Sequence, residues 1–264
     1  MPAERRGLLR LRAFATSFFI IAWTLVLSII ATVTMPLSPR GELYLTFAQI
    51  WPRVIFWVGG IRFRRSVSPL LQVEERYIYL SSHESLTDIL VLYATLPQKV
   101  VMVAKRSLLI LPIFSWGMWL AGFVFINRRN RSAAFRSMAQ AGERLRKGRS
   151  VLVFPEGTRG DGQSLGPFKK GGFILAQQAG FRVVPVGIYG TYSVLPRDTF
   201  PVFPGNVAVA VGEPMSPPEP GQPLDEFVAR VQSEVARLRE EARGLWQSMP
   251  QTPPAETMDR VSIG

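Results

Sequence analysis

Residues 77–88 read YIYLSSHESLTD, and this stretch decides the fold. The apolar and aromatic residues 77–80 predict a short strand, and the serines that follow are typical of a turn or a helix N-cap. His83 and Asp88 are five residues apart, so on one ideal helix they would be separated by roughly 140°. They would therefore not share a helix face. The spacing predicts a strand, a turn that carries His83 and a helix that contains Asp88.

His83 is the single histidine among 264 residues. An unperturbed imidazole has a pKa of about 6.5, so it can take a proton from a hydroxyl group and return it near neutral pH. A carboxylate bonded to one ring nitrogen would fix the tautomer and leave the other nitrogen free. His83 and Asp88 therefore predict a general base and the residue that orients it. The alternative is a surface histidine near a helix start.

The composition excludes several classes of protein. The chain has no cysteine and one histidine, which rules out disulfides, thiol nucleophiles and zinc sites of the hydrolase or deaminase type. No acidic cluster stands out as a magnesium site, so we expect no metal and no cofactor. The length fits one domain with a smaller attached segment.

The chain is strongly basic, with a formal net charge of +12. Such a charge attracts polyanions, and both nucleic acids and anionic membrane surfaces qualify. Hydrophobic residues make up 47% of the chain, and the basic clusters alternate with apolar segments. These features favour membrane lipids over nucleic acid as the partner.

The amino-terminal region predicts attachment to a membrane. Arginines precede an uncharged run, residues 13–37, that is long enough to cross a bilayer and too long for a typical signal peptide. A second apolar segment, residues 43–61, is interrupted by Pro52 and Arg53. The two segments fit one span plus an interfacial helix, or a hairpin that enters one leaflet. We expect the inner membrane, with the catalytic domain on the cytoplasmic side.

The rest of the chain alternates short β-branched runs with helical stretches, which predicts an α/β fold. We expect a mixed, largely parallel central sheet flanked by helices, after a membrane-associated segment at residues 1–65. The domain itself is expected at residues 66–246, and a disordered tail at 247–264. The predicted strands are 77–80, 100–104, 123–126, 150–154, 183–188 and 207–211. The predicted helices are 87–95, 108–120, 132–147, 168–179 and 224–246.

Two further stretches place charged residues at the ends of predicted strands. Residues 154–159 read FPEGTR, in which Gly157 lets the backbone approach a ligand and Arg159 can grip a phosphate. Residues 122–128 read GFVFINR and deliver Arg128 to the end of a strand, as the preceding strand delivers Lys105. An ordinary glycine-rich turn and solvated cations are the alternatives. A G-x-S-x-G match at 162–166 is interpreted as chance, because the histidine precedes the serine.

Together these blocks resemble those of the lysophosphatidate acyltransferase family, the 1-acyl-glycerol-3-phosphate acyltransferases. HESLTD resembles its H-x4-D block, GFVFINR its second, FPEGTR its third and VPVGI, residues 184–188, its fourth. Four blocks in order cover about half of the chain. The resemblance implies that His83 is the general base and Asp88 its partner. It also implies that the acceptor's glycerol phosphate binds to Lys105, Arg128, Glu156, Gly157, Thr158 and Arg159.

The resemblance implies transfer of a fatty acyl chain from acyl-CoA or acyl carrier protein to the sn-2 hydroxyl of lysophosphatidate. Glu84 departs from the asparagine or glutamine of many members, which bears on acceptor preference. Other acceptors within the enzyme class are a lyso-ornithine lipid, a lysophospholipid or glycerol 3-phosphate. A non-catalytic, basic membrane-binding protein is the alternative from a different class.

Overall fold

The computed structural model describes residues 3–38, 41–110, 114–127 and 131–250. Its centre is a seven-stranded sheet with the strand order β1-β7-β6-β2-β5-β3-β4. Neighbouring strands are parallel except β6 and β7, so β1 and β7 run against the other five. This confirms the predicted mixed, largely parallel α/β fold. The strands are β1 (Ile61–Val67), β2 (Ile78–Ser81), β3 (Val100–Lys105), β4 (Val124–Ile126), β5 (Ser150–Val153), β6 (Val183–Tyr189) and β7 (Gly205–Val211).

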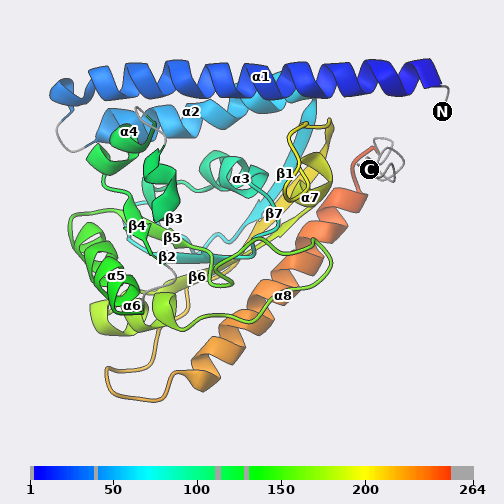
Figure 1. Ribbon diagram of the computed structural model, residues 1–264. Helices are drawn as coiled ribbons and strands as arrows, with labels where there is room; N and C mark the ends of the chain where they lie inside the picture. Colours follow the sequence, from blue (N-terminus) through cyan, green and yellow to red (C-terminus); the bar gives the residue numbers. More distant parts are fainter. Residues whose placement is uncertain (1–2, 39–40, 111–113, 128–130, 251–264) are drawn as a thin grey trace.

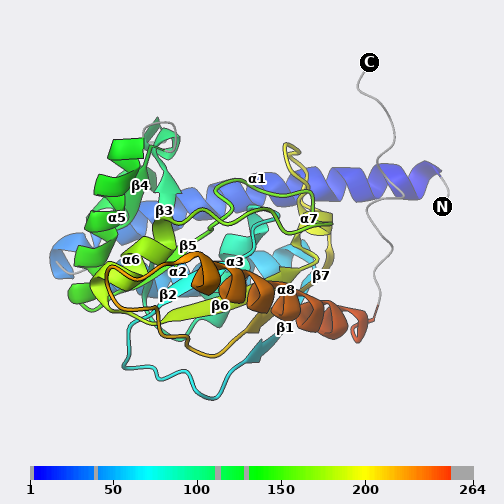
Figure 2. The same ribbon diagram turned by 90° about the horizontal axis from the view of Figure 1, so that it is seen from below.

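Helices cover both faces of the sheet (Figure 1). Helices α2 and α3 lie on one face, with α1 outermost across α2 and α4, and α6 and α8 lie on the other face. Figure 2 shows α8 crossing beneath the sheet. The helices are α1 (Ala3–Val33), α2 (Glu42–Gly59), α3 (Thr87–Thr95), α4 (Phe114–Leu120), α5 (Arg131–Arg146), α6 (Gly171–Ala179), α7 (Thr191–Val194) and α8 (Asp225–Gln247), with 3-10 turns η1 (Met35–Leu37) and η2 (Arg106–Ile110).

The central strands are buried along their whole length. Every residue of β2 and β5 is buried, and β6 is buried up to its last residue. Parallel strands with helices on both faces need apolar side chains in both directions, which explains the unbroken apolar runs of these strands. The sheet therefore gives a rigid frame whose strand ends can hold a site.

Strand β1 is an addition to the predicted elements. Arg62, Arg64 and Arg65 belong to β1, which pairs in register with β7. An edge strand tolerates charged side chains because one of its sides is open to solvent. The predicted domain boundary at residue 65 falls within this strand.

The helix predicted at 108–120 is divided into η2 and α4, with residues 111–113 outside the described ranges. Helix α8 extends to Gln247, the first residue of the predicted tail, and residues 251–264 also lie outside the described ranges.

The two apolar amino-terminal segments form α1 and α2. Gly41 separates them with a φ of 72°, and a Cβ atom there would lie 3.0 Å from Ala121 Cα. Within the described residues, one segment, Gly7–Val33 of α1, is long and apolar enough to cross a membrane, and 28% of its most apolar window is buried. Length and composition of this kind also occur in core helices and signal sequences.

Candidate active site

Three adjacent central strands end at the same edge of the sheet. Strands β6, β2 and β5 are neighbours and run parallel, so the segments that follow them meet at one edge. His83 follows β2, Glu156 follows β5 and Thr191 follows β6. This convergence brings together three polar side chains that are distant in the sequence.

His83 and Asp88 are in direct contact. His83 Nδ1 lies 2.8 Å from Asp88 Oδ2, and the imidazole stacks on Phe154 with a distance of 3.8 Å between ring centroids. His83 lies in the turn between β2 and α3, and Asp88 lies in the first turn of α3. Because a carboxylate accepts hydrogen bonds, Nδ1 carries the hydrogen of the neutral ring and Nε2 has the free lone pair.

Asp88 is fully buried, and polar hydrogens surround its carboxylate. The backbone N–H groups of Glu84 and Ser85 donate to Oδ2 at 2.7 and 2.9 Å. The hydroxyl of Thr191 donates to Oδ1. These bonds fix the carboxylate plane, and through it the orientation of His83.

The Glu156 carboxylate bonds to the backbone. Its Oε1 accepts the His83 N–H, and its Oε2 accepts the Gly166 N–H, each at 2.9 Å. The residue is buried, and burial raises the pKa of its carboxyl group against the opposing effect of these two N–H donors. Glu156 therefore joins the histidine turn to the loop that follows β5. Gly160 adds to this junction by donating its N–H to the His83 carbonyl at 2.7 Å.

Cations lie around the same loop. Gly157 has a φ of 73°, a backbone conformation that favours glycine, and the Lys169 side chain lies over it, with 2.7 Å from the position of a Cβ atom to Nζ. Arg159 is partly exposed, and its guanidinium lies 3.2 Å from the Asp198 carboxylate. Asp198 has the positive φ of 61°, which is uncommon for a residue other than glycine.

The remaining predicted binding residues are Lys105, Thr158 and Arg128. Lys105 ends β3 with an exposed side chain, and Thr158 is exposed in the loop after β5. Arg128 lies outside the described residues. Within the described ranges, no group of three or more acidic or histidine side chains is arranged to hold a metal ion.

The sequence patterns did not indicate Thr191 as a site residue. Thr191 lies 103 residues after Asp88, so no local spacing indicates their contact. The position of Thr191 directly after a predicted strand was the available signal, because polar residues at parallel strand ends gather at one edge.

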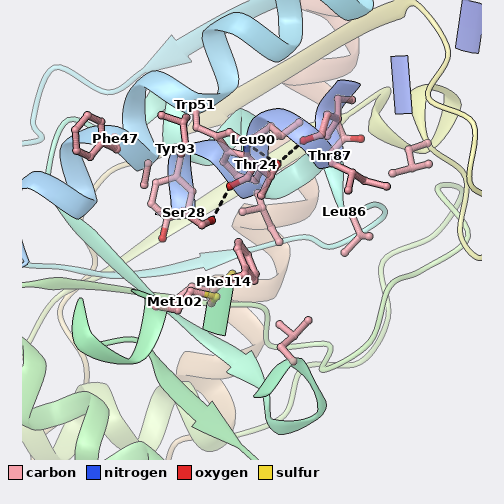
Figure 3. A pocket seen from close by; sticks show the side chains of 18 of the residues that line it. Thr24, Ser28, Phe47, Trp51, Leu86, Thr87, Leu90, Tyr93, Met102 and Phe114 are labelled. Atoms are coloured by element: carbon pink, nitrogen blue, oxygen red, sulfur yellow. Dashed lines mark hydrogen bonds between the residues drawn. The ribbon is translucent and has the colours of Figure 1, made fainter. Parts of the chain in front are cut away.

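A cavity of about 390 Å³ lies between α1, α2, α3 and α4 (Figure 3). Most of its lining is aliphatic or aromatic. Two polar lining residues of α1 are hydrogen-bonded locally: Ser28 Oγ donates to the Thr24 carbonyl at 2.6 Å, and Thr24 Oγ1 accepts from Trp51 Nε1 at 2.9 Å. The cavity is therefore suited to an apolar ligand.

One part of this cavity is adjacent to the histidine turn. Its lining includes Leu86 and Leu195, and the hydroxyl of Ser85 donates to the Leu195 carbonyl at 2.7 Å. Along α1 the lining extends from Ser17 to Ala31, which corresponds to about 21 Å of helix. The cavity is thus a long apolar space, one part of which lies beside the turn that carries His83.

The comparisons define the class of protein to which this fold and site belong. A family model described as Acyltransferase matches residues 62–189, from β1 to the end of β6. The crystal structure of the 1-acyl-sn-glycerophosphate acyltransferase PlsC from Thermotoga maritima has a similar fold, with a TM-score of 0.77. It is 24% identical in sequence, and the match covers 94% of this chain and 100% of that one.

Curated relatives identify one family within this class of proteins. A 1-acyl-sn-glycerol-3-phosphate acyltransferase of Pseudomonas aeruginosa is 32% identical over 186 residues, which are 68% of this chain and 71% of the relative. The human 1-acyl-sn-glycerol-3-phosphate acyltransferase beta is 42% identical over 135 residues, which are 51% of this chain. That match spans about half of the human protein, 48% of its length. The chain belongs to the 1-acyl-sn-glycerol-3-phosphate acyltransferase family.

Proposed function

We propose that this protein transfers a fatty acyl chain from an acyl thioester to the sn-2 hydroxyl of 1-acyl-glycerol 3-phosphate, giving phosphatidate. The observation that carries the proposal is the hydrogen bond of 2.8 Å between His83 Nδ1 and Asp88 Oδ2 beside a long apolar cavity. The pair supplies a base, and the cavity supplies space for a chain. The names of the relatives support lysophosphatidate as the acceptor.

His83 acts as the general base in this reaction. Its Nε2 takes the proton from the acceptor hydroxyl as the hydroxyl oxygen attacks the thioester carbonyl. A new oxygen–carbon bond forms, the carbon–sulfur bond breaks, and the proton passes to the leaving thiolate. Asp88 holds the tautomer that leaves Nε2 free and stabilises the imidazolium that forms. The chemistry needs no covalent acyl-enzyme, so the lack of cysteine is no obstacle.

The acceptor phosphate binds at the cations of the loop after β5. Arg159 offers a planar fork that matches phosphate oxygens, and Lys169 adds a second charge over Gly157. Glu156 has both carboxylate oxygens engaged by backbone N–H groups. We therefore assign Glu156 to holding the loop against the histidine turn and not to contact with the phosphate.

The acyl chain occupies the cavity. A fatty acyl chain in one leaflet spans about half of the 30 Å hydrocarbon core, or about 15 Å. The stretch of α1 that lines the cavity is longer than this, so a long chain fits beside it. The thioester end then lies near Leu86, three residues after His83. Acyl-CoA and acyl carrier protein are both suitable donors, because both carry the same thioester.

The protein binds one membrane leaflet through α1 and α4. The inner face of α1 closes the cavity, whereas its outer face is apolar and exposed to solvent, as are two tryptophans of α4. Because one face of α1 packs against the protein, the helix is better suited to lie in the membrane surface than to cross the bilayer. The exposed apolar residues of these two helices include Leu8, Leu11, Phe14, Phe18, Leu25, Val26, Ile29, Trp116 and Trp119. We expect the detergent-free chain to float with anionic vesicles, and a chain left in the soluble fraction would contradict this orientation.

Thiol release with a panel of acceptors tests the proposed function. The protein is mixed with an acyl thioester and lysophosphatidate, a lysophospholipid, a lyso-ornithine lipid or glycerol 3-phosphate. Release is expected with lysophosphatidate and a phosphatidate product. Release with a different acceptor alone would reassign the substrate, and no release with any acceptor from either donor would favour a binding protein.

A further inference from the structure

Glu84 and Arg239 form a buried ion pair behind the histidine turn. Arg239 Nε donates to Glu84 Oε1 at 2.7 Å, and the two side chains are 10% and 6% exposed. Glu84 directly follows His83, whereas Arg239 comes from α8, 155 residues later. Burial and the neighbouring Asp88 carboxylate raise the pKa of Glu84, whereas the charge and hydrogen bond of Arg239 lower it. Removing two charges from water costs free energy that can exceed the gain from their attraction, so such a pair is weak evidence of a contribution to folding stability.

The remaining nitrogens of Arg239 hold the loop that follows β5. Arg239 Nη1 donates to the Gln163 carbonyl at 3.2 Å, and Nη2 donates to the Gly162 carbonyl. One guanidinium therefore joins the turn that carries His83 to the loop that carries Gly160 and Gly166. Those two residues make the backbone contacts to His83 and to Glu156 described above.

A close approach between the backbones of α8 and β6 places Arg239 near the histidine turn. Gly187 lies in β6, and a Cβ atom there would lie 2.2 Å from Arg239 N and 2.3 Å from the Leu238 carbonyl carbon. Only glycine allows α8 to approach the sheet this closely at this point. The guanidinium also lies over the Tyr189 ring, with 5.5 Å between Cζ and the ring centroid. Helix α8 therefore lies close against the backbone of β6 at the point where Arg239 projects.

We propose that Arg239, paired with Glu84, is a positioning residue for acyl transfer: it fixes the distance between the His83 turn and the loop that binds the acceptor. This inference rests on the proposed function. A displacement of about 1 Å between a base and its substrate can lower a rate about 100-fold, so such a clamp acts on kcat without touching the substrate.

Arg239→Lys is the first test, because lysine keeps the charge opposite Glu84 but lacks the fork that reaches both carbonyls. We expect kcat for thiol release to fall about 10- to 100-fold, with the donor KM unchanged, since the cavity is not altered. The control is Arg237→Met, which removes an exposed arginine of α8 that pairs only with Glu234 and Glu241 in the described part of the chain. Its kcat is expected to equal that of the wild type. Equal kcat in Arg239→Lys would overturn the proposal.

The double variant Glu84→Leu with Arg239→Met separates positioning from stability. Replacing a buried ion pair by apolar residues of similar size is often neutral for folding, so the Tm is expected to stay near that of the wild type. The carbonyls of Gly162 and Gln163 still lose their donor, so kcat is expected to remain low. Recovery of kcat together with Tm would show that the pair is only structural.

The imidazole resonances of His83 give a readout that does not depend on turnover. The single histidine provides one set of ring signals. Arg239→Lys is expected to shift or broaden the Nδ1–H signal, and Arg237→Met is expected to leave it unchanged. Identical signals in wild type and Arg239→Lys would overturn the proposal. Absence of thiol release from the wild type would defeat the proposed function, whereas the His83 signal would still decide the role of Arg239.

Discussion

At the scale of single residues, His83 is held from two directions. Asp88 orients its ring, and Glu156 holds its backbone N–H at 2.9 Å. The His83 and Asp88 pair was predictable because its spacing is local and requires a turn before a helix. Thr191 and Arg239 reach this turn from segments more than 100 residues away, so no local spacing indicates those contacts.

Thr191→Val tests the orientation of Asp88. Valine has nearly the same shape but cannot donate to Oδ1, and a hydrogen bond to a buried charge contributes about 1.5–3 kcal/mol. We expect kcat to fall about tenfold through poorer orientation of His83, with the fold retained. Thr95→Val is the control, because that hydroxyl donates to the Val91 carbonyl within α3. Equal kcat in the two variants would remove Thr191 from the site.

Arg159→Ala tests the acceptor's phosphate site. Loss of a charge-assisted contact is expected to raise the KM for lysophosphatidate at least about tenfold and to leave the donor KM unchanged. Asp198→Asn should act in the opposite direction, because the Asp198 carboxylate lies 3.2 Å from the guanidinium and competes with the phosphate. Initial rates over a range of acceptor concentrations measure both effects. An unchanged acceptor KM in Arg159→Ala would contradict the assignment.

At the scale of elements, the periodicity and the β-branched runs predicted most strands and helices close to their observed bounds. Strand β1 was missed because it is an edge strand rich in arginine and resembles a charged linker. The cavity could not be predicted, because it depends on how α1, α2, α3 and α4 pack together and not on any one of them.

Ala31→Phe tests whether the cavity holds the acyl chain. Ala31 is a buried lining residue on α1, fourteen residues from the lining residue nearest the amino terminus, Ser17, so a larger side chain there shortens the available space. We expect kcat/KM for long-chain thioesters to fall about tenfold or more, while short-chain thioesters are affected less. Ile30→Phe changes a neighbouring residue that is 42% exposed and serves as the control. The same chain-length profile in both variants would contradict the assignment.

Gly187→Ala tests the close approach of α8 to β6. The added methyl group would overlap the backbone of Leu238 and Arg239, so we expect the free energy of unfolding to fall by about 3 kcal/mol or more. Gly244→Ala, also on α8, meets nothing within 4 Å and should raise that free energy by about 0.5–1 kcal/mol. Thermal unfolding distinguishes the two. A Tm unchanged in Gly187→Ala would show that the helix can move away without cost.

At the scale of the whole molecule, the fold combines an apolar cavity, a cationic loop and an exposed apolar surface on α1. In the reaction we propose, the lipid acceptor enters from the surface of α1. Its hydroxyl group then lies at His83 and its phosphate at Arg159. The basic and apolar composition predicts membrane lipids as a partner, and this stays a prediction. The position of α1 across α2 and α4 is a property of tertiary packing, so the sequence left open whether the segment spans or lies in one leaflet (Figure 1).

The most direct test of the central claim compares wild type with His83→Ala, using acyl-CoA and acyl carrier protein thioesters with and without lysophosphatidate. Thiol release that requires lysophosphatidate in the wild type and is lost in the folded His83→Ala variant is the predicted result, and the active thioester identifies the donor. Substantial acceptor-dependent release by folded His83→Ala would contradict the role of His83 as the base.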